Sequence, residues 1–208
     1  MNNRIAKVIS LVVIIFAILV MVGWFLDITF LKSISPNWVS MKFITAICFV
    51  LSGVILYLTA SSNKKNSDWR DLVLSYTIYV LLLVVMGLGL SIFFNTRTGL
   101  EDLFVKEQEG AIYTTLPGRP AISTLFAFLI ICVCGLFSLV KKNYCKRIPP
   151  YLGVMLVIIG LVAILGYIIN YPPLFFQINH ISTAMAFHTA VLFVLLGIGY
   201  LSVRYIDS

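Results

Sequence analysis

Six runs of apolar residues, each close to 20 residues long, take up most of this chain. A hydrocarbon core about 30 Å thick requires about 20 apolar residues for one helical crossing. The sequence therefore predicts an all-α, polytopic integral membrane protein with six transmembrane helices. We place these helices at residues 8–28, 43–60, 72–94, 121–140, 151–170 and 184–203.

The composition leaves no room for a soluble domain. Only 11% of the residues are charged, whereas a soluble domain carries roughly 25%. Residues 1–208 are therefore expected to form a single transmembrane domain. The first run follows Arg4 and Lys7, as in a signal peptide, but it is longer than the usual apolar region of about 7–15 residues. No small-residue cleavage site follows it, so we interpret it as a helix.

The charged residues are divided unequally between the two sides of the predicted bundle. The termini and the second and fourth loops hold ten basic and three acidic residues, whereas the remaining loops hold five of each. The whole net charge of +7 therefore lies on one side. Basic residues collect on the cytoplasmic side of membrane proteins, so we expect a multi-pass protein of the plasma membrane with both termini in the cytoplasm. This distribution argues against a nucleic-acid partner and leaves the lipid bilayer as the first partner.

The four cysteines do not form a disulfide framework or a metal site. Cys48, Cys132 and Cys134 lie within predicted helices, and Cys145 lies in a predicted cytoplasmic loop. Cys132 and Cys134 form only a C-x-C, without a second pair. Apolar packing is the better interpretation of Cys132 and Cys134, and Cys145 beside two basic residues is a candidate for acylation.

A four-residue stripe is repeated within the chain. Its residues recur every four positions on the second and sixth predicted helices, with a degenerate copy on the fourth. The copies are Met41, Thr45, Phe49 and Gly53; Met185, Thr189, Phe193 and Gly197; and Pro120, Thr124, Phe128 and Cys132. Each copy follows a long apolar helix and a loop. We therefore predict three repeated helical hairpins, at about residues 5–60, 70–140 and 149–205.

Residues spaced by four lie on one face of a helix, and small or hydroxylated residues on such faces let membrane helices approach closely. We therefore assign Gly53, Gly197 and the three stripe threonines to buried helix contacts. We expect Gly23, outside the stripe, to face lipid. A pseudo-threefold bundle with the three striped helices inside is one arrangement that buries every copy. In the loop between residues 95 and 120, the spacing of Leu100, Leu103 and Phe104 predicts a short amphipathic element.

Three stretches of the sequence resemble a known family. They are GWFLDITFLKSISPNWVSMKFITAICFVLSG at residues 23–53, TGLEDLFVKEQEGAIYTTLPGRPAISTLFAFL at 98–129, and MAFHTAVLFVLLGIGYL at 185–201. They are similar to the N-terminal membrane module that precedes PAS domains in bacterial and archaeal sensor histidine kinases and some diguanylate cyclases. The second stretch departs from the family pattern, because relatives have Met at the position of Pro120 and Thr-Ala where this chain has Thr124-Leu125.

The resemblance implies a role as a sensory input and names no stimulus or catalytic residue. In relatives the sixth helix continues into a linker and effector domains, whereas this sequence ends at Ser208. We therefore expect a module that stands alone, or one separated from its effector. Such a module acts through a cytoplasmic or membrane signalling partner, or through self-association.

Five residues are candidates for ligand contacts. They are His188, Thr189, Thr45, Lys42 and Arg119. An intramembrane histidine such as His188 is costly, and it serves as an interhelical hydrogen-bond partner, a ligand or pH-sensing group, or a metal ligand; the first is the leading interpretation. Lys42 and Arg119 stand at helix ends, where snorkelling to the interface is the leading interpretation and a vestibule for an anion or lipid headgroup is the alternative. For Asp27, pairing with Lys32 or Lys42 and ordinary solvation are equally good interpretations.

The sequence contains no catalytic or cofactor-binding pattern. We find no phosphate loop, no nucleophile and base pair, and no paired carboxylates within a predicted helix. His180 and His188 are eight residues apart at the head of one helix, which disfavours haem or a shared metal. We therefore predict a non-enzyme without a metal or cofactor. The main alternative to a sensory module is a small transporter component or channel, for which glycine pairs in the third and fifth helices are the only breaks.

Overall fold

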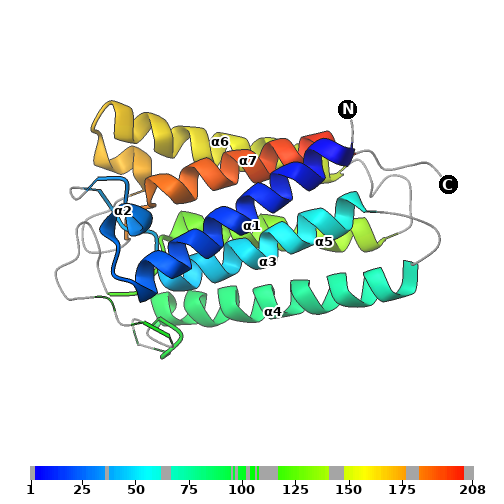
Figure 1. Ribbon diagram of the computed structural model, residues 1–208, viewed down its shortest axis with the longest axis horizontal. Coiled ribbons are helices and arrows are strands. Elements are labelled where there is room, and N and C mark those ends of the chain that lie inside the picture. The colour runs from blue at the N-terminus through cyan, green and yellow to red at the C-terminus, as the bar shows by residue number, and fades with distance from the viewer. Residues whose placement is uncertain are drawn as a thin grey trace.

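The computed structural model describes most of the chain. The described residues are 3–35, 38–61, 67–94, 96, 98–101, 104–105, 107, 117–140, 148–176 and 183–203. Within this part all regular structure is helical (Figure 1). The elements are α1 (Asn3–Phe25), α2 (Thr29–Lys32), α3 (Phe43–Ala60), α4 (Ser67–Phe93), α5 (Ile122–Leu139), α6 (Ile148–Ile168), the 3-10 helix η3 (Pro172–Phe175) and α7 (Phe187–Ser202).

Five of these helices are long and apolar enough to cross a membrane, namely α1, α3, α4, α5 and α6. The sixth apolar helix, α7, has 16 residues and is shorter than the other five. Between their ends, such helices satisfy their backbone hydrogen bonds internally, as a hydrocarbon environment requires. The predicted all-helical membrane fold is therefore confirmed at this level.

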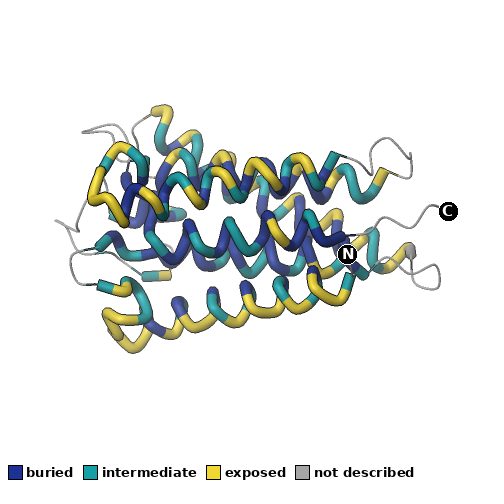
Figure 2. Tube along the Cα trace, turned by 90° about the horizontal axis from the view of Figure 1, so that it is seen from above, coloured by how far each residue is buried: buried dark blue, intermediate teal, exposed yellow. Residues whose placement is uncertain are grey.

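Three helices lie in the centre of the bundle and three at its periphery. The buried share of the apolar segment is 67% in α3 and 50% in α5, but 28% in α1 and 33% in both α4 and α6. Ten of the sixteen residues of α7 are also buried. Figure 2 shows the same division, with buried residues along the middle of the bundle and exposed residues along its edges. We call α3, α5 and α7 the central helices and α1, α4 and α6 the peripheral helices.

Each peripheral helix packs against two central helices. α1 contacts α3 and α7, α4 contacts α5 and α3, and α6 contacts α7 and α5. The start of α1 and the end of α7 lie at the same end of the bundle (Figure 1). The starts of α3, α5 and α7 meet at the opposite end. We call this the cavity end, because a small cavity lies between the three helix starts.

The striped faces of the central helices meet in the middle of the bundle. Phe49, Phe128 and Phe193 contact one another pairwise, with ring centroids 4.8 to 5.1 Å apart. All three rings are fully buried. A Cβ atom added to Gly53 or Gly197 lies 2.5 Å from Ile14 Cγ1 or from the Gly153 carbonyl oxygen, respectively. These two glycines therefore permit α1 to approach α3 and α6 to approach α7.

Two expectations from the sequence are wrong. Gly23 does not face lipid: it is buried, and an added Cβ lies 2.4 Å from Leu31 Cβ. The first helix begins at Asn3 rather than residue 8, and the third begins at Ser67 rather than residue 72, because helical hydrogen bonding continues beyond the apolar run. The predicted amphipathic element includes Leu103, which lies outside the described residues, so this element stays a prediction.

Candidate functional site

The three central helices begin in nearly the same backbone conformation. The residues before them are Lys42 (φ −68°, ψ 147°), Ala121 (φ −64°, ψ 148°) and Ala186 (φ −66°, ψ 148°), and none supplies a side-chain cap. The first N–H groups of a helix have no partner within the helix, and its N-terminus carries a partial positive charge. The cavity end therefore concentrates hydrogen-bond donors and positive potential.

A small cavity lies where these three helix starts meet. It has a volume of about 10 Å³, which is enough for about one water molecule. Thr45, Thr124 and Thr189, the third residue of each central helix, all line it. Their side chains are at most 3% exposed, and within the described part of the chain their hydroxyl groups form no hydrogen bond. The phenylalanine triad lies one helical turn further along the same helices.

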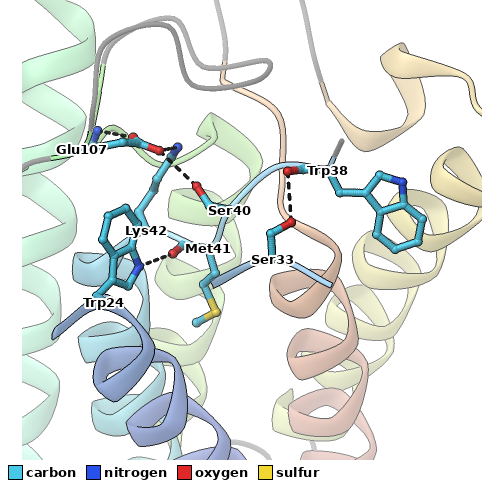
Figure 3. A network of polar contacts seen from close by, with 8 residues as sticks. Trp24, Ser33, Trp38, Ser40, Met41, Lys42 and Glu107 are labelled. Carbon is cyan, nitrogen blue, oxygen red and sulfur yellow. Dashed lines mark hydrogen bonds and ion pairs between the residues drawn. The ribbon is translucent and has the colours of Figure 1, made fainter. Parts of the chain in front are cut away.

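Lys42 lines the cavity and forms a buried ion pair with Glu107 (Figure 3). The two side chains are 4% and 5% exposed. The Glu107 carboxylate also accepts hydrogen bonds from the Ser40 hydroxyl at 3.1 Å and from the Gly118 backbone N–H at 2.7 Å. Burial lowers the pKa of the Lys42 ammonium group below its ordinary value, and the charge of Glu107 opposes this effect. This pair fastens the loop that carries Glu107 to the start of α3.

A second polar network holds the same loop against the end of α4. The Arg119 guanidinium donates to the Ser91 carbonyl oxygen at 3.0 Å and to the Thr96 carbonyl oxygen at 3.3 Å. The Glu101 carboxylate accepts hydrogen bonds from the hydroxyls of Ser91 and Thr98. Burial acts to raise the pKa of Glu101, but these hydrogen bonds, its own backbone and the charge of Arg119 together bring it below its ordinary value.

The chain reaches each central helix through a segment that we call a corner. The first corner comprises residues 26–42, the second 94–121 and the third 169–186. In the first and third corners the backbone is held in the same way. The Trp24 indole N–H donates to the Met41 carbonyl oxygen at 2.8 Å, and the Tyr167 hydroxyl donates to the Met185 carbonyl oxygen at 2.8 Å.

The backbone N–H groups of the same two methionines complete the arrangement. Met41 donates to the Lys32 carbonyl oxygen and Met185 to the Phe175 carbonyl oxygen, each at 2.9 Å. Pro120 stands at the corresponding stripe position of the second corner and has no N–H group. The second corner is instead held by Glu101, Glu107 and Arg119.

The predicted ligand residues do not all converge. Lys42, Thr45 and Thr189 line the cavity, and Thr124, which the sequence assigned to packing, joins them. Arg119 lies next to the cavity-lining Pro120, but its guanidinium is directed to Ser91 and Thr96. The snorkelling interpretation is wrong for both cations, because Lys42 is 4% and Arg119 is 5% exposed.

His188 lies apart from the cavity, at the contact between α7 and α1. Its ring lies 5.3 Å from the Phe16 ring, and the residue is 5% exposed. Its Nδ1 atom is buried and has no hydrogen-bond partner in the described part of the chain, so the expected interhelical hydrogen bond through that atom is not formed. His180 lies outside the described residues.

Sequence reasoning did not identify Glu107 as the partner of Lys42. The useful signal for Glu107 was the contrast between Lys42 and the alanines at the two corresponding positions, because a lone cation at a buried helix start requires an acidic partner.

Asp27 pairs with Lys32 at 2.5 Å, which was one of its two expected partners, and this contact lowers the pKa of Asp27. Among the described residues no group of His, Cys, Asp and Glu is arranged to hold a metal ion. Cys48, Cys132 and Cys134 are buried and free, and Cys145 lies outside the described residues.

Comparison with known proteins finds no matching family model, no matching curated protein and no matching solved structure. The candidate site therefore has to be interpreted from its own geometry.

Proposed function

We propose that this protein is a non-catalytic sensory input module of the cell membrane, in which a ligand bound in the cavity changes the arrangement of the central helices. The observation that carries this proposal is the position of the cavity. Its wall contains residues from the starts of α3, α5 and α7, so a ligand there contacts all three central helices at once. A ligand shifts an equilibrium between helix arrangements by its difference in affinity for them.

The same proposal includes six membrane crossings built as three repeated hairpins. The shared backbone angles at Lys42, Ala121 and Ala186 support it, as do the packing partners of the peripheral helices. Because α7 has only 16 residues, a sixth crossing also includes residues 183–186, which precede α7 and are all buried. The resemblance to modules that precede PAS domains supports a sensory role over a purely structural one.

The centre of the bundle favours a sensor over a transporter component or channel. The mutual contacts of Phe49, Phe128 and Phe193 close the axis one turn beyond the threonines. An ion or polar solute on this axis has to pass three buried aromatic rings. A transport pathway needs polar groups near the midplane of the membrane, whereas the buried charged residues Lys42, Glu101 and Arg119 lie at the cavity end.

We propose that the cavity end faces outward and that both termini are cytoplasmic. The charge distribution supports this orientation. An impermeant thiol reagent applied to intact cells is expected to label a cysteine placed at residue 108 and not one placed at residue 66. Both sites lie outside the described residues. The opposite labelling pattern contradicts the orientation.

The sensory proposal is tested by filling the cavity and measuring the far end of the bundle. Tyr57, Leu136 and Ile198 are exposed, one on each central helix, and accept spin labels in a background without native cysteines. Thr124→Leu places a larger side chain in the cavity. We expect the distances between the labels to change by about 1–2 Å, as in the helix shifts of allosteric transitions.

The matched control is Ile122→Leu, which changes an exposed residue on the same helix. Its label distances are expected to equal those of the unmodified protein. Unchanged distances in the folded Thr124→Leu protein contradict the proposed transmission from the cavity to the far end.

A further inference from the structure

The cavity is surrounded by hydrogen-bond donors. Lys42 supplies an ammonium group, Ser40 and four threonines supply hydroxyls, and three uncapped helix starts supply backbone N–H groups. Within the described part of the chain, no acidic side chain lines the cavity. Donors, positive charge and helix N-termini together favour an anion.

The protein itself indicates which anion fits. Glu107 brings a carboxylate to the edge of the cavity, where it bonds to Lys42 and Ser40, and both of these residues also line the cavity. Figure 3 shows the Lys42 and Ser40 side chains turned toward this carboxylate. A third donor, the Gly118 N–H, holds the other carboxylate oxygen. Glu107 is therefore bound as a tethered ligand would be.

Three further donors lie beside this carboxylate and remain unused. These donors are the hydroxyls of three cavity-lining residues, Thr45, Thr124 and Thr189, each of which is at least 97% buried. The hydroxyls form no hydrogen bond with the described part of the chain. Buried polar groups are normally paired, so these hydroxyls are available to donate to a ligand in the cavity.

We propose that the cavity is a site for a small carboxylate and that Glu107 is its built-in competitor. This inference rests on the proposed function, since it assumes that the cavity takes a ligand. An incoming carboxylate accepts hydrogen bonds from the threonines and replaces Glu107 on Lys42 and Ser40. Glu107 then leaves with the second corner, which loses its attachment to α3. The cavity has room for a carboxylate group only after this exchange, because its present volume suits about one water molecule.

The inference is tested on the full chain in nanodiscs of uncharged lipid. Sodium acetate is titrated at constant ionic strength against sodium chloride, and binding is followed by the change in melting temperature. A spin label at the exposed residue 104 reports the mobility of the second corner. We expect saturable stabilisation by acetate together with increased label mobility.

Two variants separate the site from its competitor. Glu107→Gln removes the competing charge and is expected to tighten acetate binding at least about 10-fold, which corresponds to about 1.4 kcal/mol. Thr45→Val removes one cavity hydroxyl with little change of shape and is expected to weaken binding about 3- to 10-fold. Asp27→Asn is the control, because it removes an exposed carboxylate at the same end of the bundle and is expected to change nothing.

The source of the carboxylate is distinguished by the probe. Binding of acetate from solution identifies a water-soluble acid, whereas a response to laurate in the nanodisc without one to acetate identifies a fatty-acid headgroup. Absence of both responses in the folded Glu107→Gln protein overturns the inference, and so does binding that Thr45→Val leaves unchanged.

The outcomes also separate this inference from the sensory proposal. If no carboxylate binds but Thr124→Leu still shifts the far-end distances, the ligand class is wrong and the sensory function stands. If acetate binds and releases residue 104 while the far-end distances stay constant, the site is correct and the sensory function is wrong.

Discussion

The first and third corners differ from the second in the kind of interaction that holds them. Met41 and Met185 are held by uncharged hydrogen bonds from Trp24 and Tyr167 and by backbone bonds. The second corner depends on ionisable side chains, because Pro120 has no N–H with which to repeat that bond. Uncharged bonds to the backbone are insensitive to pH and to competing ions. Charged side chains can exchange partners, so the second corner is the part of the cavity end suited to respond to a ligand.

The substitution with the largest expected effect on stability removes Lys42. Lys42→Met leaves Glu107 buried without its cation, and breaking a buried ion pair in this way costs about 3–5 kcal/mol. The double variant Lys42→Met with Glu107→Gln removes both charges and is expected to recover most of the loss. Reversible unfolding in detergent measures both values. A double variant as unstable as the single one contradicts the view that charge pairing holds the second corner.

The next effect concerns close helix approach. A Cβ at Gly197 lies 2.5 Å from the Gly153 carbonyl oxygen, and a Cβ at Gly166 lies 2.9 Å from the Phe175 backbone nitrogen in the third corner. Leucine at either position is expected to cost about 1–3 kcal/mol through overpacking. Gly53→Leu is expected at the low end of this range, because its nearest neighbour is the movable Ile14 side chain.

Gly89 in α4, near the second corner, is the matched control for these glycines. An added Cβ there has no neighbour within 4 Å, so Gly89→Leu is expected to leave the free energy of unfolding nearly unchanged. Equal melting temperatures in detergent for Gly197→Leu, Gly89→Leu and the unmodified protein contradict the assignment of the stripe to helix contacts.

A smaller effect tests the uncharged corners directly. Tyr167→Phe removes the donor to the buried Met185 carbonyl and preserves the ring contacts. Loss of one such bond is expected to cost about 1 kcal/mol. The loss is expected to be the same at pH 4 and pH 7 in thermal unfolding, since this hydrogen bond joins two uncharged groups. A strongly pH-dependent loss indicates that a charged group supports this corner too.

The smallest effect is the pH dependence of the second corner. The pKa of Glu101 in the folded protein lies below its ordinary value of 4.5, so its hydrogen bonds stabilise the fold fully above that pH. This contribution is lost as the pH falls from 4.5 through the folded pKa. Hydrogen exchange at residues 96–101 is therefore expected to accelerate below pH 4.5 relative to the Met185 N–H. Glu101→Gln is expected to abolish that dependence, and a dependence that persists assigns it to another group.

Much of the fold follows from local properties of the sequence. The length of each apolar run determines a helix that satisfies its own hydrogen bonds in lipid. The four-residue spacing of Thr45, Phe49 and Gly53 places them on one face irrespective of what that face meets. The same spacing places a threonine one turn before the stripe phenylalanine on each central helix, so the three threonines lie at a comparable distance from the helix starts. These relations involve residues within a few turns of one another, and they could be predicted.

The partners of these faces were decided by the tertiary structure. Lys42 and Glu107 are 65 residues apart, and only the return of the second corner across the start of α3 brings them together. Gly23 became a buried contact because the chain reverses at Asp27, with φ 55°, and folds Leu31 onto it. No local spacing encodes either approach. The sequence by itself therefore determined the helices and their faces, whereas the cavity, its buried ion pair and its unused hydroxyls exist only because three distant helix starts converge.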